Sequence, residues 1–97
     1  MRKIKNLHLL NAVKVKENSF RLTLQINNQT KTFQVKFEQD FVPRMFDVED
    51  DFRQILVGNP QAAQEIIQTI SEINDDKLLI FPINLAVWQN VSELQTV

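Results

Sequence analysis

Apolar and polar residues alternate strictly in two successive runs of this chain, residues 20–26 and 33–37, which a polar stretch separates. A period of two is typical of a strand that buries one of its faces. The apolar positions of the two runs are Phe20, Leu22, Leu24, Ile26, Phe33, Val35 and Phe37. The pattern therefore predicts a β-hairpin over residues 20–37, with one aliphatic and aromatic face and one face of Arg, Thr, Gln and Lys.

The register of this hairpin is predicted from the side chains that it brings opposite each other, because such pairs stabilise a sheet. A loop over residues 27–30, or a turn at its centre, places Leu24 opposite Phe33 and matches apolar to apolar throughout. A two-residue loop at Asn27 and Asn28 would place Leu24 opposite Lys31 instead, and we reject it. The stretch also lacks the Gly that a tight hairpin turn favours. We therefore predict the longer loop.

An earlier strand is predicted over residues 6–16, where Leu7, Leu9, Val13 and Val15 share a parity that Asn11 interrupts. The interruption indicates a β-bulge near residues 10–11. Short polar turns join the three strands, which favours an antiparallel meander. The outward face is then expected to carry His8, Lys14, Lys16, Arg21, Thr23, Gln25, Thr32, Gln34 and Lys36.

The second half of the chain has helical periodicity. Residues 38–46 contain Pro43 and show no clean period, so they are interpreted as a connector. Asp47 is expected to cap a helix that ends at Gly58. A second helix is expected to begin at Asn59 and Pro60, since proline suits the first helical position. Its buried stripe would be Ala62, Ala63, Ile66, Ile67, Ile70 and Ile73.

A short apolar run, KLLIF at residues 77–81, predicts a fourth strand that Pro82 ends. From Asn84 onward two interpretations stay open, a fifth strand or a short helix, and we favour the helix. The predicted fold is α+β: an antiparallel sheet of three to four strands with two helices packed on one face. We expect a single domain over residues 1–97, made of a meander (1–37), a helical pair (47–74) and a C-terminal strand and tail (77–97).

The charge distribution changes this picture, because a formal net charge of −1 hides two opposite halves. Residues 1–37 carry eight basic residues and one acid, whereas residues 38–97 carry three basic residues and eleven acids. The 97 residues contain no cysteine, which excludes disulfides and thiolate chemistry. No stretch has the pattern of a signal peptide or the length of a membrane span, so we expect a cytoplasmic protein that does not bind membranes.

Little in the sequence indicates catalysis. His8 is the single histidine, and it has no partner nearby in sequence that would orient it. No Gly-rich phosphate loop is present. Acids gather at Asp47, Glu49, Asp50 and Asp51, a set that could hold a hard cation and that a helix N-terminus also favours without a metal. We therefore expect that the protein is not an enzyme and binds no cofactor or metal. A metal-assisted hydrolase is the third hypothesis for its function.

Two other functions fit better. The first is a non-enzymatic protein–protein interaction module or assembly subunit, which binds a protein partner or itself. Its candidate apolar anchors are Phe41, Met45, Phe46 and Trp88. The alternative is a nucleic-acid-binding accessory protein that uses a basic sheet face formed by Lys14, Lys16, Arg21 and Lys36. Against the alternative, every Phe of the hairpin has the parity of the opposite face, whereas sheet proteins that bind single strands stack bases on exposed aromatics.

Overall fold

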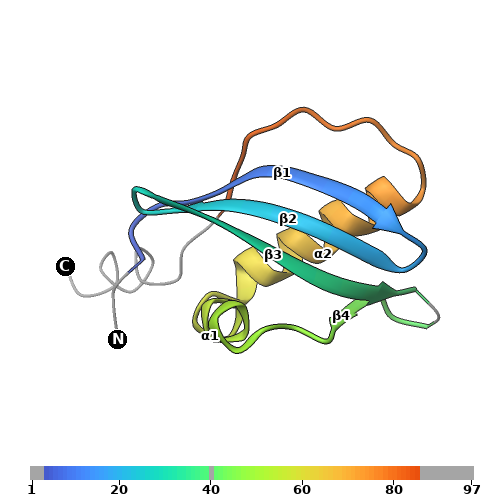
Figure 1. Cartoon of the computed structure of the whole chain (residues 1–97), viewed down its shortest axis with the longest axis horizontal. Helices are drawn as coiled ribbons and strands as arrows, with labels where there is room; N and C mark the ends of the chain where they lie inside the picture. Colours follow the sequence, from blue (N-terminus) through green and yellow to red (C-terminus); the bar gives the residue numbers. More distant parts are fainter. Residues whose placement is uncertain (1–3, 40, 86–97) are drawn as a thin grey trace.

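The computed structural model describes residues 4–39 and 41–85, and within them one antiparallel sheet is covered on one face by two helices (Figure 1). The sheet order is β4-β3-β2-β1-β5. The strands are β1 (Leu7–Lys16), β2 (Ser19–Ile26), β3 (Gln29–Glu38), β4 (Arg44–Phe46) and β5 (Ile83–Asn84), and the helices are α1 (Asp50–Gly58) and α2 (Pro60–Asn74). The predicted α+β class and N-terminal meander are confirmed. Neither helix has the length and apolarity needed to cross a bilayer.

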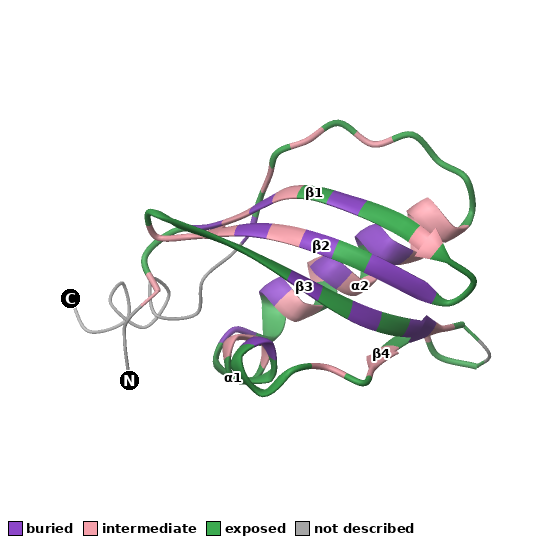
Figure 2. Ribbon diagram, viewed as in Figure 1, coloured by how far each residue is buried: buried purple, intermediate pink, exposed green. Residues whose placement is uncertain are grey.

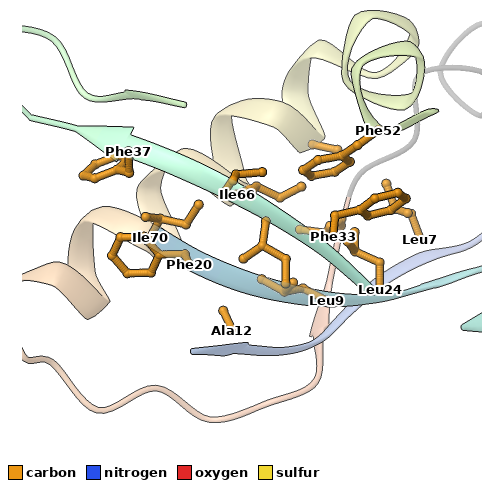
Figure 3. Close-up of a cluster of buried hydrophobic side chains, with 14 residues drawn as sticks. Leu7, Leu9, Ala12, Phe20, Leu24, Phe33, Phe37, Phe52, Ile66 and Ile70 are labelled. Carbon is orange, nitrogen blue, oxygen red and sulfur yellow. The ribbon is translucent and has the colours of Figure 1, made fainter. Parts of the chain in front are cut away.

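The core lies between the sheet and the helices, and buried residues alternate with more exposed ones along the strands (Figure 2). Phe20 and Phe37 meet edge to face, with ring centroids 5.9 Å apart. Phe33 stacks on Phe52 of α1 at 4.7 Å, with the ring planes 5° apart. From α2, Ile66 and Ile70 enter the same cluster (Figure 3). Ala62 of α2 belongs to it as well. The predicted inward faces of the hairpin and of α2 therefore meet in one core.

A β-bulge in β1 decides which of its side chains point inward. Leu9 pairs with Leu24 and Asn11 with Thr23, so Leu10 is the extra residue, as the sequence indicated. The extra residue reverses the parity that follows: Ala12 is buried, and Val13, expected in the core, is 44% exposed. A second register shift falls between Lys14 and Lys16. The predicted bulge is thus confirmed, but the shared parity of Leu9 and Val13 is wrong.

The predicted hairpin register is also wrong. Leu24 lies opposite Lys31 and Leu22 opposite Phe33, around a two-residue turn of Asn27 and Asn28. Asn27 adopts a φ of 56°, a left-handed conformation that asparagine tolerates better than most residues. Lys31 is tolerated opposite Leu24 because it is exposed near the end of the hairpin.

Asn27 also ties the hairpin turn to the chain that precedes β1. Its Oδ1 accepts hydrogen bonds from the backbone N–H groups of Lys5, at 2.8 Å, and of Asn6, at 3.3 Å. Its own backbone N–H donates to the carbonyl oxygen of Asn6 at 2.8 Å. These long-range contacts stabilise the tight turn. The pairing of apolar residues across the two strands would by itself favour a longer loop.

The helix boundaries follow the predictions with one correction. Asp47 does not cap α1, because its φ is 54° and the helix begins at Asp50 with Glu49 as its N-cap residue. Pro60 occupies the start of α2 as expected. The side chain of Asn59 donates from Nδ2 to the carbonyl oxygen of Ile55 at 2.9 Å, so it closes the end of α1.

The C-terminal part of the described chain departs most from expectation. Residues 77–81 form no strand, and the fourth strand in chain order is β4, in the stretch that was interpreted as a connector. Ile83 and Asn84 instead form β5, opposite Leu9 and His8. Asn84 therefore lies in a strand. The choice between strand and helix for the rest of the tail concerns residues 86–97, which include Trp88 and lie outside the described residues.

Candidate functional site

The bulge at Leu10 divides the predicted basic cluster. Lys16 and Lys36 both pair with Ser19, and Arg21 lies between Val13 and Gln34, so these three basic residues share the outer face of the sheet. Lys14 does not, because it lies opposite the buried Phe20 on the helix side. Its Nζ donates a hydrogen bond to Oδ1 of Asn74, at the end of α2, at 3.2 Å. The structure thus brings together three of the four predicted basic residues.

The acidic half of the chain reaches this face. Nζ of Lys36 lies 3.5 Å from Oδ2 of Asp47, and Arg44 pairs with Glu38 on the neighbouring strand. Exposed ion pairs of this kind contribute at most about 1 kcal/mol each. A shallow depression of about 190 Å³ lies beside the first pair and is lined by Lys16, Ser19, Gln34, Val35, Lys36 and Asp47. Opposite charges therefore meet within one molecule at the β3 and β4 side of the sheet.

The predicted apolar anchors are not gathered at one place. Phe41 is fully exposed, whereas Met45 lies opposite Phe37 and packs against the core. Phe46 lies opposite Lys36, so this half-buried ring belongs to the outer face. Sequence reasoning missed its place on the basic face because residues 38–46 were not expected to contain a strand.

Two of the four acids considered for a cation site, Asp47 and Asp50, make ordinary ion pairs. Asp47 pairs with Lys36, and Oδ1 of Asp50 lies 3.6 Å from Nη1 of Arg53 in the first turn of α1. Within residues 4–39 and 41–85, no three His, Cys, Asp or Glu side chains come close enough to hold a metal ion. His8 is half-buried on the outer parity, opposite Gln25 and Asn84.

A second surface, which sequence reasoning missed, is the edge of β1. β5 pairs with β1 at His8 and Leu9, and the N–H of Leu85 donates to the carbonyl oxygen of Leu7 at 2.8 Å. Among the described residues, no strand flanks residues 11–16 of β1 on the side that faces away from β2. We call this side of residues 11–16 the β1 edge. Unpaired strand edges present backbone donors and acceptors to other chains.

An apolar segment passes along this edge (Figure 1). Residues 77–82, here called the 77–82 segment, follow the end of α2, where Asn74 contacts Lys14, and lead to Ile83, opposite Leu9. Leu78 is 99% exposed and Ile80 is 89% exposed. Burial alternates residue by residue from Leu78 to Leu85, as in an extended chain. Exposed apolar residues and an unpaired strand edge therefore lie in one region of the surface.

The ladder between β5 and β1 stops at Ile83 for a local reason. Pro82 comes next and has no N–H to donate, and the position that it would face is the bulge at Leu10. Continued pairing of the 77–82 segment with its own β1 is interrupted at this point. The KLLIF run gave the signal for this region, but it did not show which strand the run would lie beside.

Models of known protein families and curated proteins give no match to this chain. The function is therefore inferred from the two surfaces described above. The outer face carries Lys16, Arg21 and Lys36 together with Phe46, and the β1 edge lies beside exposed apolar side chains.

Proposed function

We propose that this protein is a non-enzymatic protein–protein interaction module that binds its partner at the β1 edge and the 77–82 segment. The observation that carries the proposal is the exposure of Leu78 and Ile80 next to a strand edge that no other strand of the described residues covers. Addition of a partner strand to such an edge supplies affinity through main-chain hydrogen bonds, while side-chain contacts supply specificity.

The energetics favour a partner that covers these side chains. Full burial of a leucine or isoleucine side chain stabilises a complex by roughly 1.5–3 kcal/mol. Within the described residues, the backbone of Leu78 and Ile80 makes no hydrogen bond, so a partner strand could pair with it without breaking existing bonds. The ends of the segment are already fixed by α2 and β5, which limits the entropy lost on ordering it.

Site-specific photocrosslinking tests the proposal. A photoreactive amino acid at position 80 is expected to give discrete protein adducts in the native cell, whereas the same group at position 57 should give none. Val57 is the matched control because it is a 76% exposed apolar residue on α1. Equal labelling from both positions, or no adduct from position 80, would contradict the proposed interaction surface.

A second candidate function is single-stranded nucleic-acid binding on the outer face. The observation that favours it is the pairing of Phe46 with Lys36, which places an aromatic ring beside a cation on the face that also carries Lys16 and Arg21. Stacking on an aromatic ring together with phosphate contacts is the usual mode of such binding. Asp47, paired with Lys36, opposes it by placing a negative charge in the same depression.

Replacing Lys16, Arg21 and Lys36 with Gln tests this candidate. Binding to an oligothymidylate should have a log–log salt slope of about −2, since each phosphate contact on a single strand contributes about −0.7, and the triple variant should abolish it. The matched control replaces Lys5, Lys31 and Lys77 with Gln, which removes the same number of positive charges at positions outside this face. This control should bind as the wild type does. Absence of binding by the wild-type chain at about 50 mM salt excludes the candidate.

A further inference from the structure

We propose that the partner at the β1 edge is a second copy of this chain, and that the two copies exchange strands: residues 78–81 of each copy pair with the β1 edge of the other. This inference rests on the proposed function and names its partner. One chain carries both parts of such a contact: an edge, residues 11–16, and an apolar run, residues 78–81, neither of which has a strand partner there within the described part of the chain.

The two parts are held close together in each copy but do not pair there. The 77–82 segment begins near Lys14 and ends opposite Leu9, so it spans the β1 edge without a ladder to it. Pro82 and the bulge at Leu10 interrupt the intramolecular ladder, as described above. When the apolar run comes from a second copy, it does not have to continue the ladder that β5 forms with β1 in the first copy. It can therefore pair with residues 11–16 beyond the bulge.

Side-chain parity matches this pairing. Ile83 lies opposite the buried Leu9, and Phe81 and Ile83 both pack against the core, whereas Leu78 and Ile80 have the opposite parity. On the β1 edge, Val13 is the apolar residue that points to the outer face. A strand that keeps the parity of the 77–82 segment would place Leu78 and Ile80 beside Val13 of the partner copy, so exposed apolar side chains would cover one another.

The charges do not oppose the contact. Lys14 is the basic residue in the middle of the β1 edge, and its Nζ is drawn toward Asn74 on the helix side. A lysine that stood across the edge would guard it against pairing. The formal net charge of the chain is −1, so repulsion between two copies is weak.

Reciprocal exchange closes the assembly. When each copy donates its run to the other, the contact is isologous, and a two-fold dimer has no such edge left for further chains. Paired edges also remove the aggregation risk of an unpaired strand. A discrete dimer is therefore expected.

The first experiment measures the molar mass of the full chain by light scattering over a range of concentrations, at about 50 mM and about 500 mM salt. We expect a dimer at both salt concentrations, because the contact is apolar. Replacing Leu78 and Ile80 with Lys should weaken dimerisation at least about 100-fold, as it places four charges in the contact. The matched control replaces Val42 and Val57 with Lys, two residues that are 70% and 76% exposed elsewhere on the surface, and it should remain a dimer.

Three results would overturn the inference. They are a wild-type monomer at every concentration, a dimer that high salt dissociates, and a dimer that survives in the Leu78 and Ile80 variant. Both variants should keep the thermal unfolding midpoint of the monomeric fold, since every substituted side chain is exposed. A change in oligomeric state without loss of folding then reports on the contact itself.

Disulfide trapping identifies the contact, because the chain has no cysteine. We expect a Val13→Cys chain mixed with an Ile80→Cys chain to form cross-linked dimers under mild oxidation in higher yield than either variant forms by itself. Equal yields from the mixture and from the separate variants would overturn the pairing. Photocrosslinks from position 80 to other proteins, together with a monomeric purified chain, would overturn self-recognition and leave the proposed interaction surface standing. No adduct from position 80 and no dimer would overturn both.

Discussion

Phe52→Ala is expected to lower the free energy of unfolding by about 3–5 kcal/mol, the cost of truncating a large buried aromatic side chain. Phe52 is fully buried and is the buried residue of the nine-residue helix α1. Its ring stacks on Phe33 of β3 at 4.7 Å and thereby fixes α1 to the sheet. A loss of this size is a large part of the stability of a small domain, which is about 5–15 kcal/mol in total.

Urea denaturation followed by circular dichroism measures this loss. Val57→Ala is the control on the same helix, and it should change the unfolding free energy by no more than about 0.5 kcal/mol, because Val57 is largely exposed. A cost below about 1 kcal/mol for Phe52→Ala would mean that the stack on Phe33 does not anchor α1, since even partial cavities cost more than this.

Asn27→Ala is expected to cost about 1–3 kcal/mol, from two separate causes. Alanine adopts the left-handed conformation of this turn residue less readily than asparagine does. The substitution also removes Oδ1, which accepts from the backbone of Lys5 and Asn6. The contacts lie at the surface, so water replaces part of what is lost.

Two further substitutions separate these causes. Asn27→Gly keeps the left-handed turn and loses the acceptor, so it should lose less stability than Asn27→Ala. Asn27→Asp keeps both the acceptor and the tolerance of positive φ, so it should unfold close to the wild-type urea midpoint. Equal losses for Gly, Asp and Ala would show that neither the turn conformation nor the acceptor accounts for the effect.

The parts of the fold that local periodicity determines could be predicted from the sequence. Alternation over residues 20–26 and 33–37 identified β2 and β3, and the Ala and Ile stripe identified α2 with Pro60 at its start. The Leu10 bulge was also visible as a break in the alternation of β1. Each of these signals is contained within a few neighbouring residues.

What could not be predicted depends on contacts between distant residues. The tight turn at Asn27 is stabilised by Lys5 and Asn6, which lie more than 20 positions earlier. The register was predicted by placing apolar residues opposite apolar residues, which leaves out these hydrogen bonds. The predicted register of the hairpin was therefore wrong.

The positions of the predicted site residues could be foreseen only in part, for a similar reason. The bulge at Leu10 moved Lys14 off the basic face, and a second register shift between Lys14 and Lys16 kept Lys16 on it. The ladder between β1 and β5 stops at Ile83, next to Pro82. Phe46 joined the outer face because a strand of three residues forms where Pro43 suggested none. Small irregularities in β1 thus changed which side chains share a surface, although β1, β2 and β3 had been predicted as strands.

Amide hydrogen exchange, measured residue by residue at low and at high protein concentration, tests most directly whether the β1 edge and the 77–82 segment form the interaction surface. At low concentration the amides of Leu78 and Ile80 should exchange at nearly the intrinsic rate, since their backbone makes no hydrogen bond within the described residues. At high concentration they should become protected, together with alternate amides of residues 11–16, while protection of the β2 and β3 ladder stays constant. Fast exchange of Leu78 and Ile80 at every concentration, or new protection confined to the outer face, would contradict self-association at this edge.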